Sequence, residues 1–366
     1  MISSPSDPAA PLVYAPLPNH MLAWQLLGHG GPEQLAQNTR TPLPTLASSD
    51  VLIKVAASAV NNTDINTRTA WYSKGDNASD ASWSGEALTF PRIQGADVCG
   101  HIVAVGSAVD PGRIGQRVLI EPCLQFANGQ RLTTPWYFGS ECDGGFAQYT
   151  KVDHRHAHPI NSPLSDAELA SFPCSYSTAE NMLCRAGVQA EETVLITGAS
   201  GGVGSAAVQL AKARGAKVVA ITRANKAAQL KALGAERVLT REQSLVTALG
   251  NNNVDTVIDL VAGAAWPQLL DVLKPGGRYA VAGAIGGALV ELDVRTLYLK
   301  DLSLLGCTVL GNGVFASLIQ RIEQGQIRPL VAATYPLTQL HQAQAAFAEK
   351  HHTGKIVLTI GHEKQI

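Results

Sequence analysis

The most constraining feature of the sequence is a glycine-rich turn between a short apolar run and a helix, in VLITGASGGVGSAAVQLAKARG at residues 194–215. The apolar run predicts a buried strand, and the residues after the turn show helical spacing of small and apolar side chains. Glycines let the backbone approach a pyrophosphate, and a helix N-terminus offers free N–H groups and a positive dipole end. The stretch therefore predicts a dinucleotide-binding turn. The helix face comprises Val203, Ala207, Leu210 and Ala211.

The glycine spacing departs at one position from the usual G-x-G-x-x-G pattern. Ala199 occupies the first position, Gly201 and Gly204 fill the other two, and Gly202 adds freedom beside them. A glycine-rich turn without a ligand is the alternative. The second strand, expected at residues 217–222, follows at the spacing of a βαβ unit, which favours dinucleotide binding.

The end of that second strand predicts which dinucleotide is bound. A carboxylate there would bind the adenosine ribose 2′-OH and would repel a 2′-phosphate. This chain instead has Thr222, Arg223 and Lys226, a hydroxyl and two cations that suit a phosphate. NADPH is therefore expected over NADH, and two solvated cations at a helix start are the alternative.

The pattern of apolar residues, glycines and prolines divides the chain into two regions with different expected structures. Residues 20–155 read as short strands rich in Val and Ile, with long irregular stretches at 73–87 and 124–145 that we expect near a site. From residue 165 the pattern turns helical, and then strands and helices alternate. Six such strands predict an α/β fold, with a doubly wound parallel Rossmann sheet beside a β-rich domain.

Composition limits the possible partners and locations. The formal net charge of -1 offers no basic surface for nucleic acid. The proline-rich start at residues 1–20 lacks the pattern of a secretory signal, and no apolar run is long enough to span a membrane. The six cysteines form no C-x-x-C pair, so we expect free thiols and a cytoplasmic location.

Two stretches resemble a known family. GADVCGHIVAVGSAV at 95–109 and LITGASGGVGSAAVQLAK at 195–212 are similar to the medium-chain dehydrogenase/reductases, in particular the zinc-independent quinone oxidoreductase (zeta-crystallin-like) branch. The proline-rich composition of residues 1–20 predicts a flexible arm. The resemblance implies a GroES-like catalytic domain at 21–173 and 311–366, and a Rossmann domain at 174–310. It also implies a homodimer.

The positions that bind catalytic zinc in related alcohol dehydrogenases are changed in this chain. The resemblance places Asn61, Ala96 and Cys174 there, and an amide, a methyl group and one thiol do not supply three zinc ligands. A structural zinc lobe would need four close cysteines, but only Cys123 and Cys142 lie in that region. We therefore expect no metal.

Three histidines form a second metal-like cluster. His154, His156 and His158 alternate along the sequence, so they are expected on one face of a strand. They could bind a metal, although a solvated strand edge is the favoured interpretation.

The resemblance points to Asn61, Thr63 and Tyr72 as catalytic residues. The Asn61 amide could orient the nicotinamide ribose or a carbonyl oxygen, and the Tyr72 hydroxyl could donate a proton. Thr63 matches a proton-relay position, and Asp64 is expected to be structural. The alternatives are a turn residue for Asn61 and a half-buried aromatic for Tyr72.

The same resemblance implies further cofactor contacts and a reaction. It assigns Lys355 to the pyrophosphate, with a solvated strand terminus as the alternative. The expected activity is NADPH-dependent, zinc-independent reduction of a quinone or an α,β-unsaturated carbonyl, with a small-molecule substrate. The rivals are a metal-free carbonyl reductase or alcohol dehydrogenase, and a non-enzymatic NADPH-binding sensor or crystallin-like protein. The other implied contacts are Ser200, Gly201, Gly202 and Val203 at the pyrophosphate, and Ala282, Gly283, Leu310 and Gly311 near the nicotinamide.

Overall fold

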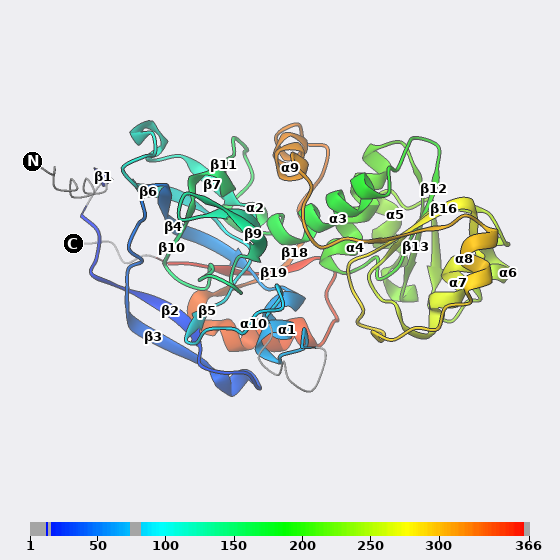
Figure 1. Cartoon of the computed structure of the whole chain (residues 1–366), viewed down its shortest axis with the longest axis horizontal. Helices are drawn as coiled ribbons and strands as arrows, with labels where there is room; N and C mark the ends of the chain where they lie inside the picture. The colour runs from blue at the N-terminus through cyan, green and yellow to red at the C-terminus, as the bar shows by residue number, and fades with distance from the viewer. Residues whose placement is uncertain (1–11, 14–15, 74–81, 362–366) are drawn as a thin grey trace, which may run out of the picture. The chain divides into compact units, whose positions relative to one another are not determined.

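The computed structural model describes residues 12–13, 16–73 and 82–361, which form two compact units (Figure 1). Unit 1 comprises Met1–Cys174, Val331–His351 and Lys355–Ile366, and unit 2 comprises Ser175–Leu330 and His352–Gly354. The expected domain boundaries at residues 173 and 310 stay predictions. Residues 74–81 of the expected irregular stretch lie outside the described residues.

Unit 2 is built on a six-stranded sheet in which every neighbouring pair of strands is parallel. Its order is β14-β13-β12-β15-β16-β17, so the strand order reverses between β12 and β15. This is the doubly wound arrangement expected from the alternating pattern, and it confirms the predicted fold class. The strands are β12 (Thr193–Ile196), β13 (Lys217–Thr222), β14 (Arg237–Thr240), β15 (Val254–Asp259), β16 (Leu273–Val281) and β17 (Ser303–Gly306).

Helices cover this sheet as the sequence predicts. Helix α4 contacts β12 and β13, α5 contacts β14, and α7 contacts β16 (Figure 1). The buried face of α4 includes the predicted apolar positions Ala207, Leu210 and Ala211, all fully buried. The helices of the sheet are α4 (Gly202–Ala213), α5 (Ala227–Ala232), α6 (Leu245–Leu249), α7 (Trp266–Asp271) and α8 (Val294–Leu299).

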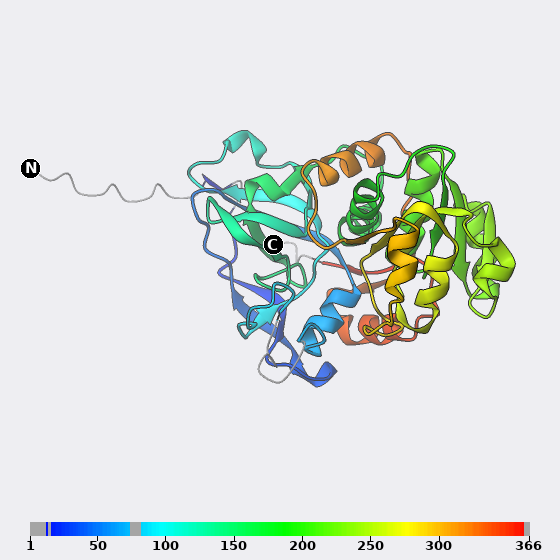
Figure 2. The same ribbon diagram turned by 45° about the vertical axis from the view of Figure 1, so that its right-hand side comes forward.

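Side-chain contacts attach the segment before β18 to the rest of unit 2. Helix α9 (Val314–Glu323) lies beside α3 (Pro173–Arg185), where Arg321 forms an ion pair of 3.5 Å with Glu180 (Figure 2). The carbonyl of Arg328 accepts from the Tyr176 hydroxyl at 2.6 Å, and its N–H donates to Gln209 at 2.8 Å. These bonds hold the segment before β18 on unit 2. The apolar pattern of that segment does not predict them.

Unit 1 is mostly antiparallel sheet. Its main sheet has the order β11-β7-β6-β4-β19-β18, with β1 paired to β6 and β10 paired to β4, and smaller sheets are formed by β3-β2-β5 and β8-β9. Helix α10 (Leu340–Ala348) contacts β18 and β19, and α1 (Asn62–Arg68) follows β4. The strands are β1 (Leu12–Val13), β2 (His20–Leu26), β3 (Leu35–Pro42), β4 (Asp50–Ala59), β5 (Arg92–Ile93), β6 (Cys99–Val105), β7 (Arg117–Ile120), β8 (Cys123–Ala127), β9 (Gln130–Tyr137), β10 (Tyr149–Asp153), β11 (Ala157–Pro159), β18 (Val331–Pro336) and β19 (Lys355–Thr359).

The stretch expected to be irregular at 124–145 contains a β-hairpin instead. Strands β8 and β9 pair in antiparallel register around Asn128 and Gly129, which both have positive φ. Asn-Gly is the preferred pair for such a two-residue turn, and this signal could have predicted the hairpin.

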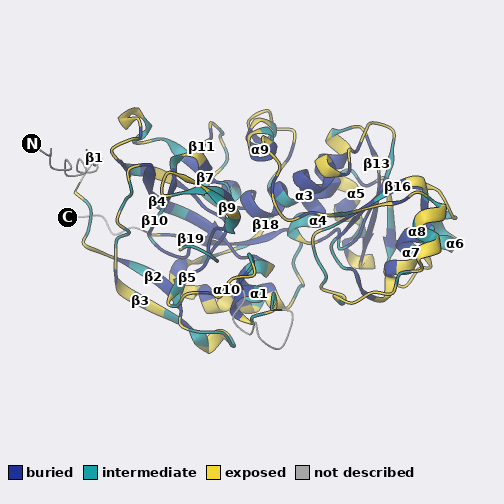
Figure 3. Ribbon diagram, viewed as in Figure 1, coloured by how far each residue is buried: buried dark blue, intermediate teal, exposed yellow. Residues whose placement is uncertain are grey.

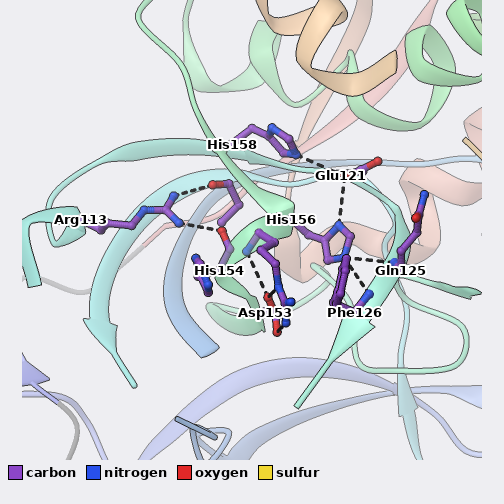
Figure 4. A network of polar contacts seen from close by, with 10 residues as sticks. Arg113, Glu121, Gln125, Phe126, Asp153, His154, His156 and His158 are labelled. Carbon is purple, nitrogen blue, oxygen red and sulfur yellow. Dashed lines mark hydrogen bonds and ion pairs between the residues drawn. The ribbon is translucent and has the colours of Figure 1, made fainter. Parts of the chain in front are cut away.

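The three histidines do not lie on one strand face, and that prediction was wrong. His154 and His156 belong to a 3-10 turn, because Asp153 accepts from the N–H of Arg155 and caps it. The His156 ring is buried: Nε2 accepts from the N–H groups of Gln125 and Phe126, both at 3.1 Å (Figure 4). His156 therefore anchors strand β8.

The same network accounts for the other ring nitrogen. With Nε2 accepting, His156 carries its hydrogen on Nδ1 and donates to Glu121 at 3.0 Å, and His158 contacts the same carboxylate at 3.3 Å. Arg113 binds the turn through the carbonyls of His154 and Ala157 (Figure 4). This arrangement fixes a hairpin and leaves no face on which the three rings could converge on a metal.

The helical segment from residue 165 is divided into two helices. Helix α2 (Asp166–Leu169) begins at the predicted N-cap Ser165, whose hydroxyl accepts from the N–H of Glu168. Pro173 lacks an N–H group and starts α3 anew. Among the described residues, none of the helices combines the length and apolar character needed to cross a bilayer.

Candidate functional site

A buried polar cluster in unit 1 forms where β4 ends. The chain leaves β4 at Ala59 and enters α1 at Asn62, so Asn61 becomes the N-cap of that helix. Its N–H donates to the Asp64 carboxylate at 2.7 Å. The backbone thus holds Asn61 and Asp64 side by side, and both are buried.

Asp97 joins this cluster from the turn IQGADVCG between β5 and β6. Gly95 opens the turn with a φ of +104°, a conformation that side chains other than glycine rarely adopt. The Asp97 side chain is fully buried, and its Oδ2 accepts from Asn61 Nδ2 at 2.9 Å. Its Oδ1 accepts from the N–H of Cys174 at 2.5 Å, so the carboxylate connects α1 to the start of α3.

Lys355 supplies the positive charge of the cluster. Strand β19 pairs antiparallel with β4, and Val357 lies opposite Ala59, which brings Lys355 beside Asn61. Its ammonium lies 2.8 Å from Asp97 Oδ2 and also donates to Asn61 Oδ1. The predicted contact of Lys355 with pyrophosphate stays a prediction.

The orientation of the Asn61 amide follows from these partners. An ammonium only donates and a carboxylate accepts, so Oδ1 faces Lys355 and Nδ2 faces Asp97. The second Nδ2 hydrogen is directed at the carbonyl of Ala59, 3.2 Å away. Both donor hydrogens of the Asn61 amide are therefore used within the protein, and its oxygen accepts from the Lys355 ammonium.

Thr63 and Tyr72 form a hydroxyl pair on helix α1 and the turn after it. The Tyr72 hydroxyl donates to Thr63 Oγ1 at 3.1 Å, and both residues are half-buried. Burial raises the pKa of Tyr72, and the charge of Asp64 adds to this, so the phenol keeps its proton at neutral pH. Thr63 can then donate its own hydrogen onward.

Cys174 is a neutral thiol in this environment. Its Sγ lies 3.0 Å from the Tyr137 hydroxyl, and burial, with a smaller contribution from Asp97, raises the pKa of Cys174 to about 12. A buried thiol with so high a pKa packs as a small apolar side chain and is not a reactive thiolate.

Unit 2 contributes the glycine-rich turn. Gly201 is the N-cap of α4, and Gly198 adopts a φ of +56°, so the glycine that makes the sharp turn lies one position before Ala199. A Cβ on Gly204 would lie 2.3 Å from the Gly198 carbonyl oxygen, so only glycine lets the helix approach the turn this closely. The predicted residues Ser200 to Val203 all lie at this helix N-terminus.

A buried aspartate supports the turn and was missed from the sequence. Asp259, at the end of β15, accepts from the Thr197 hydroxyl and from the Tyr279 hydroxyl, both at 2.5 Å. It also accepts from the N–H groups of Val261 and Ala262. Thr197 follows β12, so this carboxylate ties together the two strands between which the order of the sheet reverses.

The predicted phosphate-binding residues lie at the carboxyl end of β13 and directly after it. Thr222 is buried, and its hydroxyl has no hydrogen-bond partner within the described part of the chain. Arg223 is exposed, whereas the Lys226 ammonium donates to the carbonyl of His352. Burial lowers the pKa of Lys226, and so do the charges of Arg223 and Arg241.

Arg241 is a further cation that sequence reasoning missed. It follows Thr240, which lies opposite Thr222 in the parallel register of β13 and β14. The carboxyl end of the next strand was the signal that could have indicated it.

The remaining predicted nicotinamide contacts follow strand ends in unit 2. Ala282 and Gly283 come directly after β16, and the Ala282 N–H donates to the Asp259 carbonyl at 3.2 Å. Leu310 is buried, and the Gly311 N–H donates to Asn181 Oδ1 at 3.2 Å. Their roles toward a cofactor stay predictions.

Comparisons with known proteins agree with both units. The family model described as "Alcohol dehydrogenase GroES-like domain" matches residues 47–162, and the one described as "Zinc-binding dehydrogenase" matches residues 202–324. A solved structure from Sinorhizobium meliloti, which carries the provisional name of an alcohol dehydrogenase, is 45% identical, with a TM-score of 0.88, covering 94% of this chain and 98% of that one. The chain belongs to the medium-chain dehydrogenase/reductase family.

Curated relatives place this member of the family in the quinone oxidoreductase branch. Quinone oxidoreductase from Rattus norvegicus is 29% identical over 349 residues, covering 92% of this chain and 96% of the relative. The NADPH-dependent alkenal/one oxidoreductase of Arabidopsis thaliana is 28% identical over 349 residues, covering 94% and 81%. These similarities support an oxidoreductase that uses a nicotinamide cofactor and a small-molecule substrate.

The name of one matching family raises the question of a catalytic zinc, and the residues present do not fit one. Ala96 has no donor atom, the Asn61 oxygen accepts from Lys355, and the Cys174 thiol is protonated. A divalent cation bound here would need the Asp97 carboxylate as a ligand. The Lys355 ammonium already lies 2.8 Å from that carboxylate and would repel the cation. Throughout the described ranges, no three His, Cys, Asp or Glu side chains are grouped so that they could hold a metal.

Asp64 provides a pH-dependent test of the cluster. Burial raises its pKa from 3.8 to about 7, although the N–H of Asn61 and the charge of Lys355 oppose the shift. The folded state therefore holds the proton more tightly than the unfolded state, and the resulting stabilisation is present below pH 4 and is lost as the pH rises toward 7. Asp64→Asn keeps an acceptor for the Asn61 N–H and removes the titration.

We expect the free energy of unfolding of the wild type, relative to D64N, to fall by about 4 kcal/mol between pH 4 and pH 8. Urea unfolding of both proteins across this range measures the difference. Parallel pH profiles for the two proteins would show that Asp64 does not titrate in the folded state as described.

Proposed function

We propose that this protein is an NADPH-dependent reductase that works without a metal and transfers hydride to a quinone or to the β-carbon of an α,β-unsaturated carbonyl. The observation that carries the proposal is the hydroxyl pair of Tyr72 and Thr63 beside a cluster that lacks the donors of a zinc site. A metal-free reductase needs a proton donor at the oxygen of its acceptor, and this pair supplies one.

The residues of the chain have defined tasks in this reaction. A nicotinamide, when bound, supplies the hydride, and the protein orients the acceptor and provides the proton. Thr63 donates its hydrogen to the acceptor oxygen, Tyr72 replaces that proton along their 3.1 Å hydrogen bond, and solvent water returns a proton to Tyr72 before the next turnover. Asn61, held between Lys355 and Asp97, orients the nicotinamide ribose.

Conjugated acceptors suit a site of this kind. Hydride addition to an enone or quinone yields an enolate or phenolate whose charge is delocalised, so neutral hydroxyl donors can stabilise it. A saturated carbonyl yields a localised alkoxide, for which a metal Lewis acid is more necessary.

The test of this proposal follows NADPH oxidation with a quinone, an enone and a saturated aldehyde. We expect the first two to be reduced and the aldehyde to be a poor substrate. Tyr72→Phe should lower kcat on the enone by about tenfold or more, because Thr63 loses its proton source. Tyr335→Phe, which changes a half-buried tyrosine elsewhere in unit 1, is the matched control and should leave kcat unchanged.

Two results would contradict the proposal and favour its rivals. Reduction of the aldehyde but not of the enone would indicate a carbonyl reductase or alcohol dehydrogenase, in line with the provisional name of the Sinorhizobium meliloti structure. Tight NADPH binding without turnover of any acceptor would indicate a non-enzymatic binding protein.

The preference for NADPH rests on the ends of β13 and β14. Thr222 offers a buried hydroxyl, and Arg223 and Arg241 lie close enough to Lys226 that their charges lower its pKa. No carboxylate stands between Thr222 and Lys226 to bind a ribose 2′-OH. The site therefore suits a 2′-phosphate.

Arg223→Ala should lower kcat/KM for NADPH by about tenfold or more, since a charge-assisted hydrogen bond of this kind contributes about 1.5–3 kcal/mol. The value for NADH should change by less than about twofold. Lys231→Ala, which removes another exposed cation of unit 2, is the control. Equal losses with both cofactors would contradict the assignment of Arg223 to the 2′-phosphate.

We further propose a homodimer and a cytoplasmic location. Strand β17 ends the sheet order of unit 2, and Leu304 on this strand is 39% exposed. Helix α8, which precedes β17 in the chain, is also exposed, with Leu299 at 70% (Figure 3). An apolar sheet edge of this kind fits a second copy of the chain. All six cysteines are free, which suits a reducing compartment, and subcellular fractionation tests that location.

Leu304→Lys on β17 should shift the protein from dimer to monomer in sedimentation equilibrium, because a charge on the strand edge opposes pairing. Leu27→Lys, at an exposed leucine of unit 1, is the control and should leave the dimer intact. A wild-type protein that sediments as a monomer would contradict the dimer.

A further inference from the structure

The Lys355 ammonium is buried to an unusual degree. The residue is 2% exposed, and the fully buried Asp97 carboxylate lies 2.8 Å away. Lysine is almost never fully buried unless it is paired, because removing its charge from water is unfavourable. The pair is completed by the Asn61 amide, which bonds to both charged groups.

Stability alone is a weak reason for such a pair. A buried ion pair loses about as much in desolvation as it gains in attraction, and apolar side chains of similar volume often stabilise a fold equally well. Residue Lys355 starts β19, whose next residues Ile356, Val357 and Leu358 are all buried and apolar. A cation at the start of this apolar strand is therefore better explained by a role in organising the site.

The position of the pair indicates that role. Asp97 contacts Lys355, Asn61 and the N–H of Cys174, so one carboxylate connects the ammonium to two of the three positions expected for metal ligands. We propose that the ammonium of Lys355 takes the place of a metal cation in this cluster, positioning the Asn61 amide and excluding a divalent metal from the space between Asn61, Asp97 and Cys174.

The exclusion follows from charge and from occupied lone pairs. Asp97 Oδ2 is the acceptor for both Lys355 and Asn61, and the Asn61 oxygen accepts from Lys355. A metal would have to displace the ammonium from these oxygens or approach a like charge within a few ångströms. The positioning part rests on the proposed reductase function, whereas the exclusion part rests on the contacts alone.

A metal-binding experiment tests the exclusion without any substrate. Asn61→Cys introduces a thiol beside Asp97 and Cys174, which gives three potential donors, enough for a site with an open position. We expect N61C to bind no Co²⁺, because Lys355 remains on Asp97. The double variant N61C/K355M should bind about one equivalent of Co²⁺ and show a thiolate-to-cobalt charge-transfer band. N61C/K355R restores a positive charge and should again bind none.

Several outcomes would overturn the exclusion. Co²⁺ binding by N61C as tight as that by N61C/K355M would show that the ammonium is no barrier. Absence of binding by N61C/K355M, with its fold confirmed by circular dichroism, would show that removing the cation does not open a site. Binding by N61C/K355R would mean that the shape of the lysine matters and its charge does not.

Steady-state kinetics test the positioning role. Lys355→Met should lower kcat for an enone by about 100-fold, as expected when a reacting geometry is lost, while KM for NADPH changes little. K355M/D97N removes both charges and leaves no unpaired buried ion. If K355M does not fold, kcat of this double variant provides the same test. Lys151→Met is the matched control, since it removes a lysine that lies 2.8 Å from the buried Asp50 outside the cluster.

The kinetic result separates this inference from the proposed function. Wild-type kcat retained in both K355M and K355M/D97N would overturn the positioning role and leave the reductase proposal standing. An inactive wild type would overturn the reductase proposal, and the Co²⁺ experiment would still decide the exclusion.

Discussion

The ion pair between Lys355 and Asp97 is the interaction on which the arrangement of the candidate site depends. The antiparallel register of β19 and β4 brings the lysine beside Asn61, and the turn between β5 and β6 presents the aspartate. The pair then fixes which side of the Asn61 amide donates and which accepts. Without the lysine, Asp97 would be a buried carboxylate without a countercharge, and the start of α3 would lose a defined anchor.

This interaction also sets the chemistry that the site can support. A fixed ammonium balances negative charge but offers no open coordination position, so the proposed reaction depends on hydroxyl donors to activate the acceptor. In that proposal the donors are Tyr72 and Thr63, which share a hydrogen bond, and burial keeps the Tyr72 phenol protonated. In the proposed function, a lysine, an amide and two hydroxyls together take the tasks that a metal would otherwise perform.

Much of the fold could be predicted from the sequence, because its strands and helices follow local patterns. The parallel strands are short runs of Val and Ile, and the turn at Gly201 and Gly204 has few other structural solutions. The hairpin at Asn128 was missed although its Asn-Gly pair is a local signal, and the histidine prediction failed because Asp153 caps a 3-10 turn. Both errors arose at turns that are set by individual residues. The alternation of apolar and polar residues along a strand does not predict such turns.

The candidate site was only partly predictable for a different reason. Asn61, Thr63 and Tyr72 are close in sequence and were named together, whereas the partners of Asp97 come from segments more than 30 residues away on either side, as the 36 residues to Asn61 and the 77 to Cys174 show. Likewise, Lys355 could be placed only through the register of β19, and Arg241 only through that of β14. Contacts between distant segments depend on the assembled sheets, which a single sequence does not specify.

The most direct test of the central claim is enone reduction by NADPH before and after exhaustive treatment of the enzyme with a strong zinc chelator. A centre organised by the Lys355 ammonium predicts the same kcat and KM in both samples, with no gain when zinc is returned. Loss of activity on chelation, followed by its recovery with one equivalent of zinc, would contradict the account.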